Sequence, residues 1–218
     1  MATMLILRLE GVLQSWGSAS RFDNRDSGRM PTKSGVIGLI ACALGYARGD
    51  ERIEKLSDSL QMGVRADRAG RMMVDYQTVT GERGYLFNAE GKKRVGEPTI
   101  LTPRQYLEDA CFTVALAGDV SLLHACADAL KAPTWQIYLG RKSCVPVRPV
   151  YEELRDYPSM DEALEHYPLC ERHDDVQGWR CEIEDPGGML FRRDVIRESG
   201  RRYDIRRVRP PRASGKGV

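Results

Sequence analysis

Two short stretches of the sequence combine cations, hydroxyls and glycines in a way that suits a phosphate-bearing ligand. Residues 29–45 read RMPTKSGVIGLIACALG, in which Lys33 and Ser34 stand where an apolar helix should begin. A helix start offers unpaired backbone N–H groups and the positive end of the helix dipole, so it suits an anion. The second stretch is GRKS at residues 140–143, where an arginine offers a planar fork of donors beside a glycine.

A third stretch adds groups that recognise bases. Residues 14–17 read QSWG, which supplies an amide, a hydroxyl and an aromatic ring, the mixture that stacks on and reads unpaired bases. Arg25 and Arg29 lie just before the expected helix. Each stretch alone is unspecific, since Trp16 is equally well explained as a core residue and Ser34 as a helix N-cap. Together they favour a single-stranded nucleic acid over a small molecule.

A nucleotide-binding P-loop does not explain the first stretch. That loop needs G-x-x-x-x-G-K-[ST] directly after a strand, so that backbone N–H groups wrap the phosphate. Here Gly28 precedes Lys33 with a spacing one residue short, the second glycine is missing, and the preceding apolar strand ends near Gly11.

Catalytic and metal chemistry find little support. His124 lies within an apolar helical pattern, which favours a packed core histidine, and His166 and His173 lie in an acidic stretch. Asp174 and Asp175 are adjacent carboxylates without a matching cluster of ligands, and the six cysteines form no CxxC pair. We therefore predict no catalytic residue, no metal and no cofactor.

Composition and charge point to a soluble protein with one strongly basic surface. The chain is 42% hydrophobic and 29% charged, as in ordinary globular proteins, and no apolar run is long enough to span a bilayer. Cysteines in apolar segments fit a reduced, cytoplasmic protein. Residues 192–218 hold ten basic and three acidic residues, whereas residues 151–175 hold two basic and nine acidic ones. Such segregation predicts a basic face for a polyanion.

Hydrophobic periodicity predicts an α+β sheet with helices on one face, built on a split βαβ core. The expected strands are 3–10, 61–67, 71–79, 110–118, 179–185, 188–196 and 203–209, with a turn at Ala69-Gly70. The expected helices are 34–46, 51–60, 119–133 (with Asp119 or Ser121 near its N-cap) and 159–167. Between residues 80 and 103 the chain is charged and rich in glycine, which predicts a projecting hairpin that turns around residues 88–92.

Five segments, in this order and spacing, resemble one known family. They are MLILRLEGVLQSWG, RMPTKSGVIGLIACALG, DYQTV, EDACFTVAL and YLGRKSCVP. The family is CasD, the RAMP-type subunit of the type I-E CRISPR Cascade complex that holds the 5′ handle of the guide RNA (crRNA). The resemblance is close over residues 4–148 and loose in the C-terminal third.

The resemblance implies a fold and a set of partners. The fold would be a ferredoxin-like, RRM-related palm, residues 1–79 and 105–218, with an inserted β-hairpin thumb at residues 80–104. The palm would hold the crRNA 5′ handle in antiviral defence, and the thumb would reach along the guide. Its neighbours would be the Cascade backbone subunit and the large PAM-reading subunit, with target DNA contacted indirectly and no membrane. The basic tail, residues 201–216, would contact RNA or one of these subunits.

The resemblance and the motifs together define the expected RNA contacts. In the palm they are Gln14, Ser15, Trp16, Arg25, Arg29, Lys33, Ser34, Arg104, Gly140, Arg141, Lys142 and Ser143. In the thumb they are Arg83, Tyr85, Lys92, Lys93 and Arg94. The helices expected after PTKSG and after LGRKSC would face the handle with their N-terminal ends.

Two other functions stay open at this point. Relatives in type I-C systems cut precursor RNA without a metal, and general acid–base cleavage of that kind needs a positioned His, Lys or Tyr. Tyr46, Tyr76 and Lys33 are the candidates for such an endoribonuclease. A pure scaffold that touches only protein is the third possibility.

Overall fold

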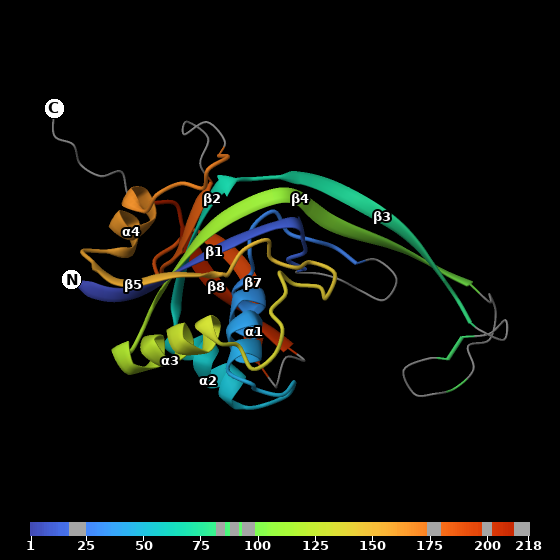
Figure 1. The fold of residues 1–218 in the computed structure, drawn as a ribbon, viewed down its shortest axis with the longest axis horizontal. Helices are drawn as coiled ribbons and strands as arrows, with labels where there is room; N and C mark the ends of the chain where they lie inside the picture. Colours follow the sequence, from blue (N-terminus) through green and yellow to red (C-terminus); the bar gives the residue numbers. More distant parts are fainter. Residues whose placement is uncertain are drawn as a thin grey trace.

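The chain folds into one antiparallel sheet with helices packed against it (Figure 1). The computed structural model describes residues 1–17, 25–81, 86, 87, 92, 99–173, 180–197 and 202–211. Within them lie eight strands and four helices, which confirms the α+β class. No helix among these residues is both long and apolar enough to cross a membrane.

The centre of the sheet has four strands in the order β5-β1-β4-β2. They are β1 (Ala2–Gln14), β2 (Gln61–Arg68), β4 (Thr99–Ala117) and β5 (Tyr151–Tyr157). Because β1 and β2 both run antiparallel to β4, they are parallel to each other with β4 between them. The crossover from β1 to β2 holds α1 (Lys33–Ala43) and α2 (Arg52–Ser59), and that from β4 to β5 holds α3 (Val120–Lys131).

Both faces of this centre are buried. Alternate residues of a strand point to opposite faces, and those of β1 join two separate clusters. Leu5 and Leu7 pack in the large core with α1 and α3, whereas Met4 and Ile6 pack with Met160 of α4 (Met160–His166). The prediction that all helices lie on one face is therefore wrong, because α4 covers the opposite face. Two-sided burial also explains why β1 is apolar at every position from Met4 to Leu7.

Three more strands extend the sheet beyond β2. They are β6 (Cys181–Glu184), β7 (Leu190–Arg197) and β8 (Arg202–Arg209), and they follow in the order β6-β8-β7. This leaves β7 at the edge, where it packs on α1 and α2 and adds Ile196 to the large core. The C-terminal strands thus form a wall beside α1.

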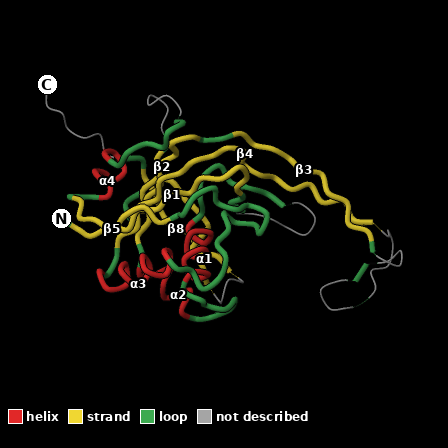
Figure 2. The backbone as a smooth tube through the Cα atoms, viewed as in Figure 1, coloured by secondary structure: helices red, strands yellow, loops and turns green. Residues whose placement is uncertain are grey.

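A long two-stranded arm projects from the sheet (Figure 2). It consists of β3 (Arg71–Thr80) paired with the first half of β4, in continuous register from Arg71–Glu108 to Thr80–Thr99. The turn expected at Ala69-Gly70 is confirmed, since Gly70 links β2 to β3 with a φ of +71°. The hairpin turn expected around residues 88–92 lies outside the described residues, apart from residue 92.

Most of the predicted helices and strands are confirmed, and each wrong or missing prediction has an identifiable cause. Asp119 is the N-cap of α3, where its carboxylate accepts a hydrogen bond from the Leu122 N–H at 3.1 Å. The start of β4 at Thr99 was missed because polar residues there pair only with β3. The sequence YEELRDY gave no strand signal, yet it forms β5 because β1 offers it a free edge. His124 is exposed on α3, so the core placement predicted for it is wrong.

A buried ionic cluster holds α4 on its face of the sheet. The Asp67 carboxylate accepts hydrogen bonds from Arg8 and, at 2.6 Å, from Arg65 Nε. These guanidiniums also donate to carbonyls at the end of α4, among them Tyr167 O at 2.9 Å. Burial is the largest single influence on the Arg8 guanidinium and lowers its pKa. The surrounding groups, Asp67 foremost and Glu152 among the others, together outweigh burial, so the pKa is raised. Asp67 therefore compensates two buried cations.

We expect Asp67→Asn to lower the free energy of unfolding by about 3–5 kcal/mol, because it removes the carboxylate shared by two buried guanidiniums and leaves only the more distant Glu152 near Arg8. Urea unfolding followed by circular dichroism measures this change. Asp128→Asn is the matched control, since Asp128 is exposed and pairs only with Lys131; it should shift stability by less than about 0.5 kcal/mol. Equal effects of the two substitutions would contradict the assigned role of Asp67.

Candidate nucleic-acid interface

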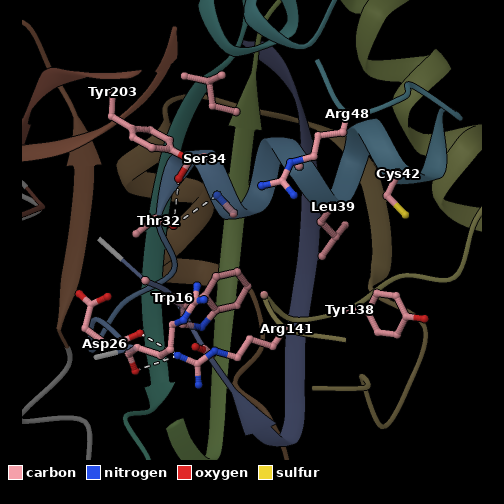
Figure 3. Close-up of a pocket in the computed structure, with 17 residues that line it drawn as sticks. Trp16, Asp26, Thr32, Ser34, Leu39, Cys42, Arg48, Tyr138, Arg141 and Tyr203 are labelled. Carbon is pink, nitrogen blue, oxygen red and sulfur yellow. Dashed lines mark hydrogen bonds between the residues drawn. The ribbon is translucent and has the colours of Figure 1, made fainter. Parts of the chain in front are cut away.

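A groove of about 660 Å³ runs beside α1 (Figure 3). Its walls come from α1, from the loop after β1, from residues 138–141 and from the C-terminal strands. Six of the residues predicted from separate motifs line it together: Ser15, Trp16, Arg25, Ser34, Gly140 and Arg141. The structure thus brings QSWG, PTKSG and LGRKSC to one place.

The floor of the groove is an exposed face of α1. Gly35, Gly38 and Cys42 follow one another at spacings of three and four, so they share one side of the helix. A methyl group added at Gly35 would meet the Trp16 ring at 2.8 Å, whereas one added at Gly38 would meet nothing within 4 Å. At Gly38 the helix backbone itself is open to a ligand.

The first three residues of the QSWG segment are buried and support the groove from the core side. Trp16 is a core residue with 1% exposure, and its indole N–H donates to Gln14 Oε1 at 3.0 Å. Gln14 is fully buried and donates to the carbonyls of Leu9 and Ala110. Ser15 is buried as well. These side chains are already satisfied, so we leave Gln14 and Trp16 out of the proposed RNA contacts.

Lys33 is also turned inward. Its ammonium is buried and lies 2.8 Å and 2.9 Å from the two carboxylate oxygens of Glu184 on β6. The N-cap of α1 is Thr32, whose hydroxyl accepts from the Gly35 N–H, and not Ser34. We therefore leave Lys33 out of the phosphate contacts, since Glu184 already neutralises it.

The start of α1 already holds an anion of the chain itself. The Lys33 N–H donates to the Asp194 carboxylate at 2.8 Å, and Arg206 binds the same carboxylate at 2.7 Å and 2.9 Å. Asp194 reaches inward from a register irregularity in β7, between Arg193 and Val195. The positive end of the helix is therefore capped by Asp194, and a phosphate would have to displace a buried ion pair.

The GRKS loop shapes another wall. No helix follows it, contrary to the prediction; residues 140–150 form turns that lead to β5. Gly140 has a φ of +98°, and a methyl group on it would lie 1.8 Å from the Ser15 carbonyl oxygen. Only glycine fits where these two segments touch.

Arg141 fastens this loop to the base of the arm. Its guanidinium donates to the carbonyls of Gln105 (3.0 Å), Arg25 (2.9 Å) and Asp26 (3.1 Å), and it lies 4.6 Å from the centre of the Tyr106 ring. Because its N–H groups already bind these carbonyls, the Arg141 guanidinium holds this wall of the groove in position. Lys142 and Ser143, next in the loop, are exposed.

Other exposed cations remain for a ligand. Arg25 and Arg48 both line the groove, and Arg48 extends over the α1 face near Leu39 (Figure 3). Arg29 is exposed outside the groove lining, and Arg104 is half-buried, with its Nε 3.3 Å from the Thr102 hydroxyl.

Sequence reasoning missed Arg48 and the two tyrosines of the groove, Tyr138 and Tyr203. Arg48 follows the end of α1 closely enough for its position to be inferred from the helix. Tyr203 carried no local signal, because only the packing of β7 and β8 against α1 brings it there. The expected thumb residues Arg83, Tyr85, Lys93 and Arg94 lie outside the described residues, and Lys92 is exposed.

One group of described residues has the ligand types of a metal site, namely Asp67, Cys111 and Cys170, all buried. Asp67 already neutralises Arg8 and Arg65, so a metal ion would face two fixed positive charges. Burial raises the pKa of the Cys111 thiol, which disfavours the thiolate that a metal needs. The group does not fit a metal centre.

Comparison with known proteins identifies the family. The family described as "CRISPR-associated protein (Cas_Cas5)" matches residues 4–213. The chain is 38% identical over 163 residues to CRISPR system Cascade subunit CasD of Escherichia coli (strain K12), an alignment that covers 69% of this chain and 70% of that protein. The chain belongs to the Cas5/CasD family.

Solved structures agree with this assignment. A chain of a structure described as a CRISPR RNA-guided surveillance complex superposes on this Cas5 protein with a TM-score of 0.78 and 36% identity, covering 95% of this chain and 90% of that one. A structure described as a crystal structure of Cas protein gives a TM-score of 0.74 and 37% identity, covering 95% of both chains. The fold similarity therefore extends through the C-terminal strands, where the sequence resemblance is loose.

Two glycines that line the groove of this Cas5 protein should respond oppositely to alanine. We expect Gly140→Ala to lower the free energy of unfolding by about 1–3 kcal/mol, because the residue has a positive φ and touches Ser15 O. Gly38→Ala should raise it by about 0.5–1 kcal/mol, because alanine favours a helix interior and its methyl group enters open space. Chemical denaturation of both variants provides the measurement. A stabilised Gly140→Ala variant would contradict the contact described here.

Proposed function

We propose that this Cas5 protein is the non-catalytic subunit of a type I-E Cascade complex that holds the crRNA 5′ handle in the groove beside α1. The observation that carries the proposal is the groove itself, in which a bare stretch of helix backbone lies between exposed arginines. The relationship to CasD supports a Cascade setting, with crRNA and the other Cascade subunits as partners in the cytoplasm.

The groove offers separate places for phosphates and bases. Arg25 and Arg48 provide cations for the RNA backbone, and Gly38 lets a sugar or phosphate approach α1 closely. Ser34 supplies a hydroxyl, and Tyr138 supplies a ring on which an unpaired base can stack. In this proposal the motifs predicted from sequence mainly hold the groove in shape, and the exposed side chains contact the RNA.

The fold and the arm belong to the same proposal. The order β5-β1-β4-β2, with its two crossovers, supports the proposal of a ferredoxin-like palm. We assign the palm to residues 1–79 and 105–218 and the thumb to residues 80–104; the β3–β4 ladder forms the stem that connects them. Val74, Tyr76 and Leu101 are exposed on the stem, which gives it apolar surface for a neighbouring subunit or the RNA.

The endoribonuclease is not favoured by the geometry. Lys33 is buried against Glu184 at the start of α1. Tyr46 lies beyond the other end of this helix, which rises by about 15 Å from its first residue to its last at about 1.5 Å per residue. Tyr76 is on the arm, and the Tyr46 ring lies 4.0 Å from the Arg52 guanidinium. These three candidates do not form one site for general acid–base catalysis.

The proposal is tested by incubating the purified chain with labelled CRISPR repeat RNA in the absence of metal and resolving the products on native and denaturing gels. We expect a shifted, intact band that is lost when the 5′ handle is scrambled. A discrete cleavage product would identify an endoribonuclease. Absence of any shift would favour a scaffold that binds only protein.

Charge removal in the groove should weaken handle binding in a salt-dependent way. We expect Arg25→Gln and Arg48→Gln each to lower affinity and to reduce the slope of log K against log salt by about 0.7, the value for one phosphate of a single strand. Fluorescence anisotropy titrations at several salt concentrations measure both quantities. Arg155→Gln is the control, since Arg155 is exposed on β5 at the other edge of the sheet. An unchanged slope in both groove variants would remove these residues from the interface.

The reactivity of Cys42 can show whether RNA occupies the groove. Cys42 is half-buried and lines the groove, whereas the other five cysteines are buried. Burial raises the pKa of the Cys42 thiol, but this thiol is more accessible than the five buried ones, so a thiol-alkylating reagent should modify it first. Handle RNA should slow this modification, as measured by mass spectrometry of the native chain. Alkylation of Cys42 at the same rate with saturating RNA would place the RNA elsewhere.

A further inference from the structure

A second cavity, the outer cavity, lies along the C-terminal hairpin, which β7 and β8 form. It has a volume of about 630 Å³ and is lined by Arg193, Arg202, Tyr203, Asp204 and Ile205. Tyr203 also lines the groove beside α1, so the two spaces share this residue. A strand of RNA that leaves the groove past Tyr203 would enter this outer cavity.

The strand register explains why one face of this hairpin, the outer face, is apolar and cationic at once. On β8, Tyr203, Ile205 and Arg207 are alternate residues and share the outer face, while Arg206 and Val208 are buried. The partner strand β7 sets Arg193 opposite Ile205 and Phe191 opposite Arg207. Tyr203, Ile205 and Phe191 are 42%, 54% and 58% exposed.

The net charge of the outer cavity is positive. The one carboxylate among its described lining residues, Asp204, is already paired with Arg197, whose Nε lies 3.0 Å from Asp204 Oδ2. Arg193 is exposed and has no ion-pair partner among the described residues. An anion entering the cavity therefore meets an available guanidinium beside an exposed aromatic ring.

We propose that this outer face is a second subsite for single-stranded RNA, in which a base stacks on Tyr203 and the adjoining phosphate binds Arg193. The inference rests on the proposed function, because it continues the path of an RNA held in the groove. Rings and cations that alternate over a strand face are the combination that binds unpaired nucleotides. A protein partner fits less well, since Ile205 and Phe191 each face an arginine across the ladder and protein interface cores are depleted of charge.

The test measures the affinity of the full chain for single-stranded RNAs that begin with the handle sequence and grow in length at one end. For the unmodified chain, affinity should rise when the RNA becomes long enough to pass Tyr203. Tyr203→Leu should remove that rise, by roughly five- to a hundredfold, because it removes the stacking ring. Tyr203→Phe keeps the ring and should preserve the rise.

Arg193→Gln is an independent variant at an exposed position, and it should lower the salt slope for the long RNAs alone. Arg155→Gln on β5 is again the matched control and should change nothing. Thermal melting of each variant establishes that it is folded. If Tyr203→Leu lowers the melting temperature, the Arg193→Gln titration decides the question.

The outcomes separate this inference from the proposed function. If Arg48→Gln weakens binding but Tyr203→Leu and Arg193→Gln bind every length like the unmodified chain, the second subsite is overturned and the groove stands. If these two variants weaken only the association with other Cascade subunits, the outer face is a protein interface and the subsite is again overturned. If the unmodified chain binds no RNA, both proposals fail.

Discussion

The candidate groove depends on the buried ion pairs that fasten the start of α1 to the C-terminal strands. Asp194 caps the first N–H of the helix and binds Arg206, while Lys33 binds Glu184 of β6. Buried charges tolerate few alternative arrangements, because an unpaired one costs several kcal/mol. These contacts therefore set where β7 and β8 lie relative to α1. They place Ile196 in the core and Tyr203 at the groove.

This arrangement moves anion binding away from the helix end. A helix N-terminus attracts phosphates only while its N–H groups and dipole are unsatisfied. Here Asp194 and Thr32 each accept a hydrogen bond from one N–H of the first turn, and the exposed backbone at Gly38, part-way along the helix, becomes an accessible surface. Positive charge at the groove comes from Arg25 and Arg48 instead. The chain thus separates the residues that build the groove from those that face a ligand.

Strand β4 connects the groove to the arm. One half of it lies at the centre of the sheet between β1 and β2, and the other half pairs with β3 in the arm. At the junction, Arg141 holds the carbonyls of Gln105 and Arg25, so the groove wall and the arm share a rigid joint. On the opposite face, the Asp67 cluster holds α4 against the same sheet.

The sequence by itself determined most of the elements and the segments that meet at the groove. Helices α1, α2 and α3 and strand β1 follow from periodicity and from caps such as Asp119, which act within a few residues. The three motifs could be grouped as one site because their residue types suit the same ligand. In contrast, β5 was not predictable, because its strand conformation comes from pairing with β1 and not from its own composition.

Only the tertiary structure decided which of those residues face outward. Lys33 finds Glu184 and Asp194 more than 150 residues away in the chain, and Arg141 finds carbonyls of the arm and the loop before α1. Trp16 is buried against Gly35, whereas Arg48 and Tyr203 reach the groove without any motif. Local spacing can predict where a helix begins, but the exposure of a charged side chain depends on partners that folding brings from distant parts of the chain.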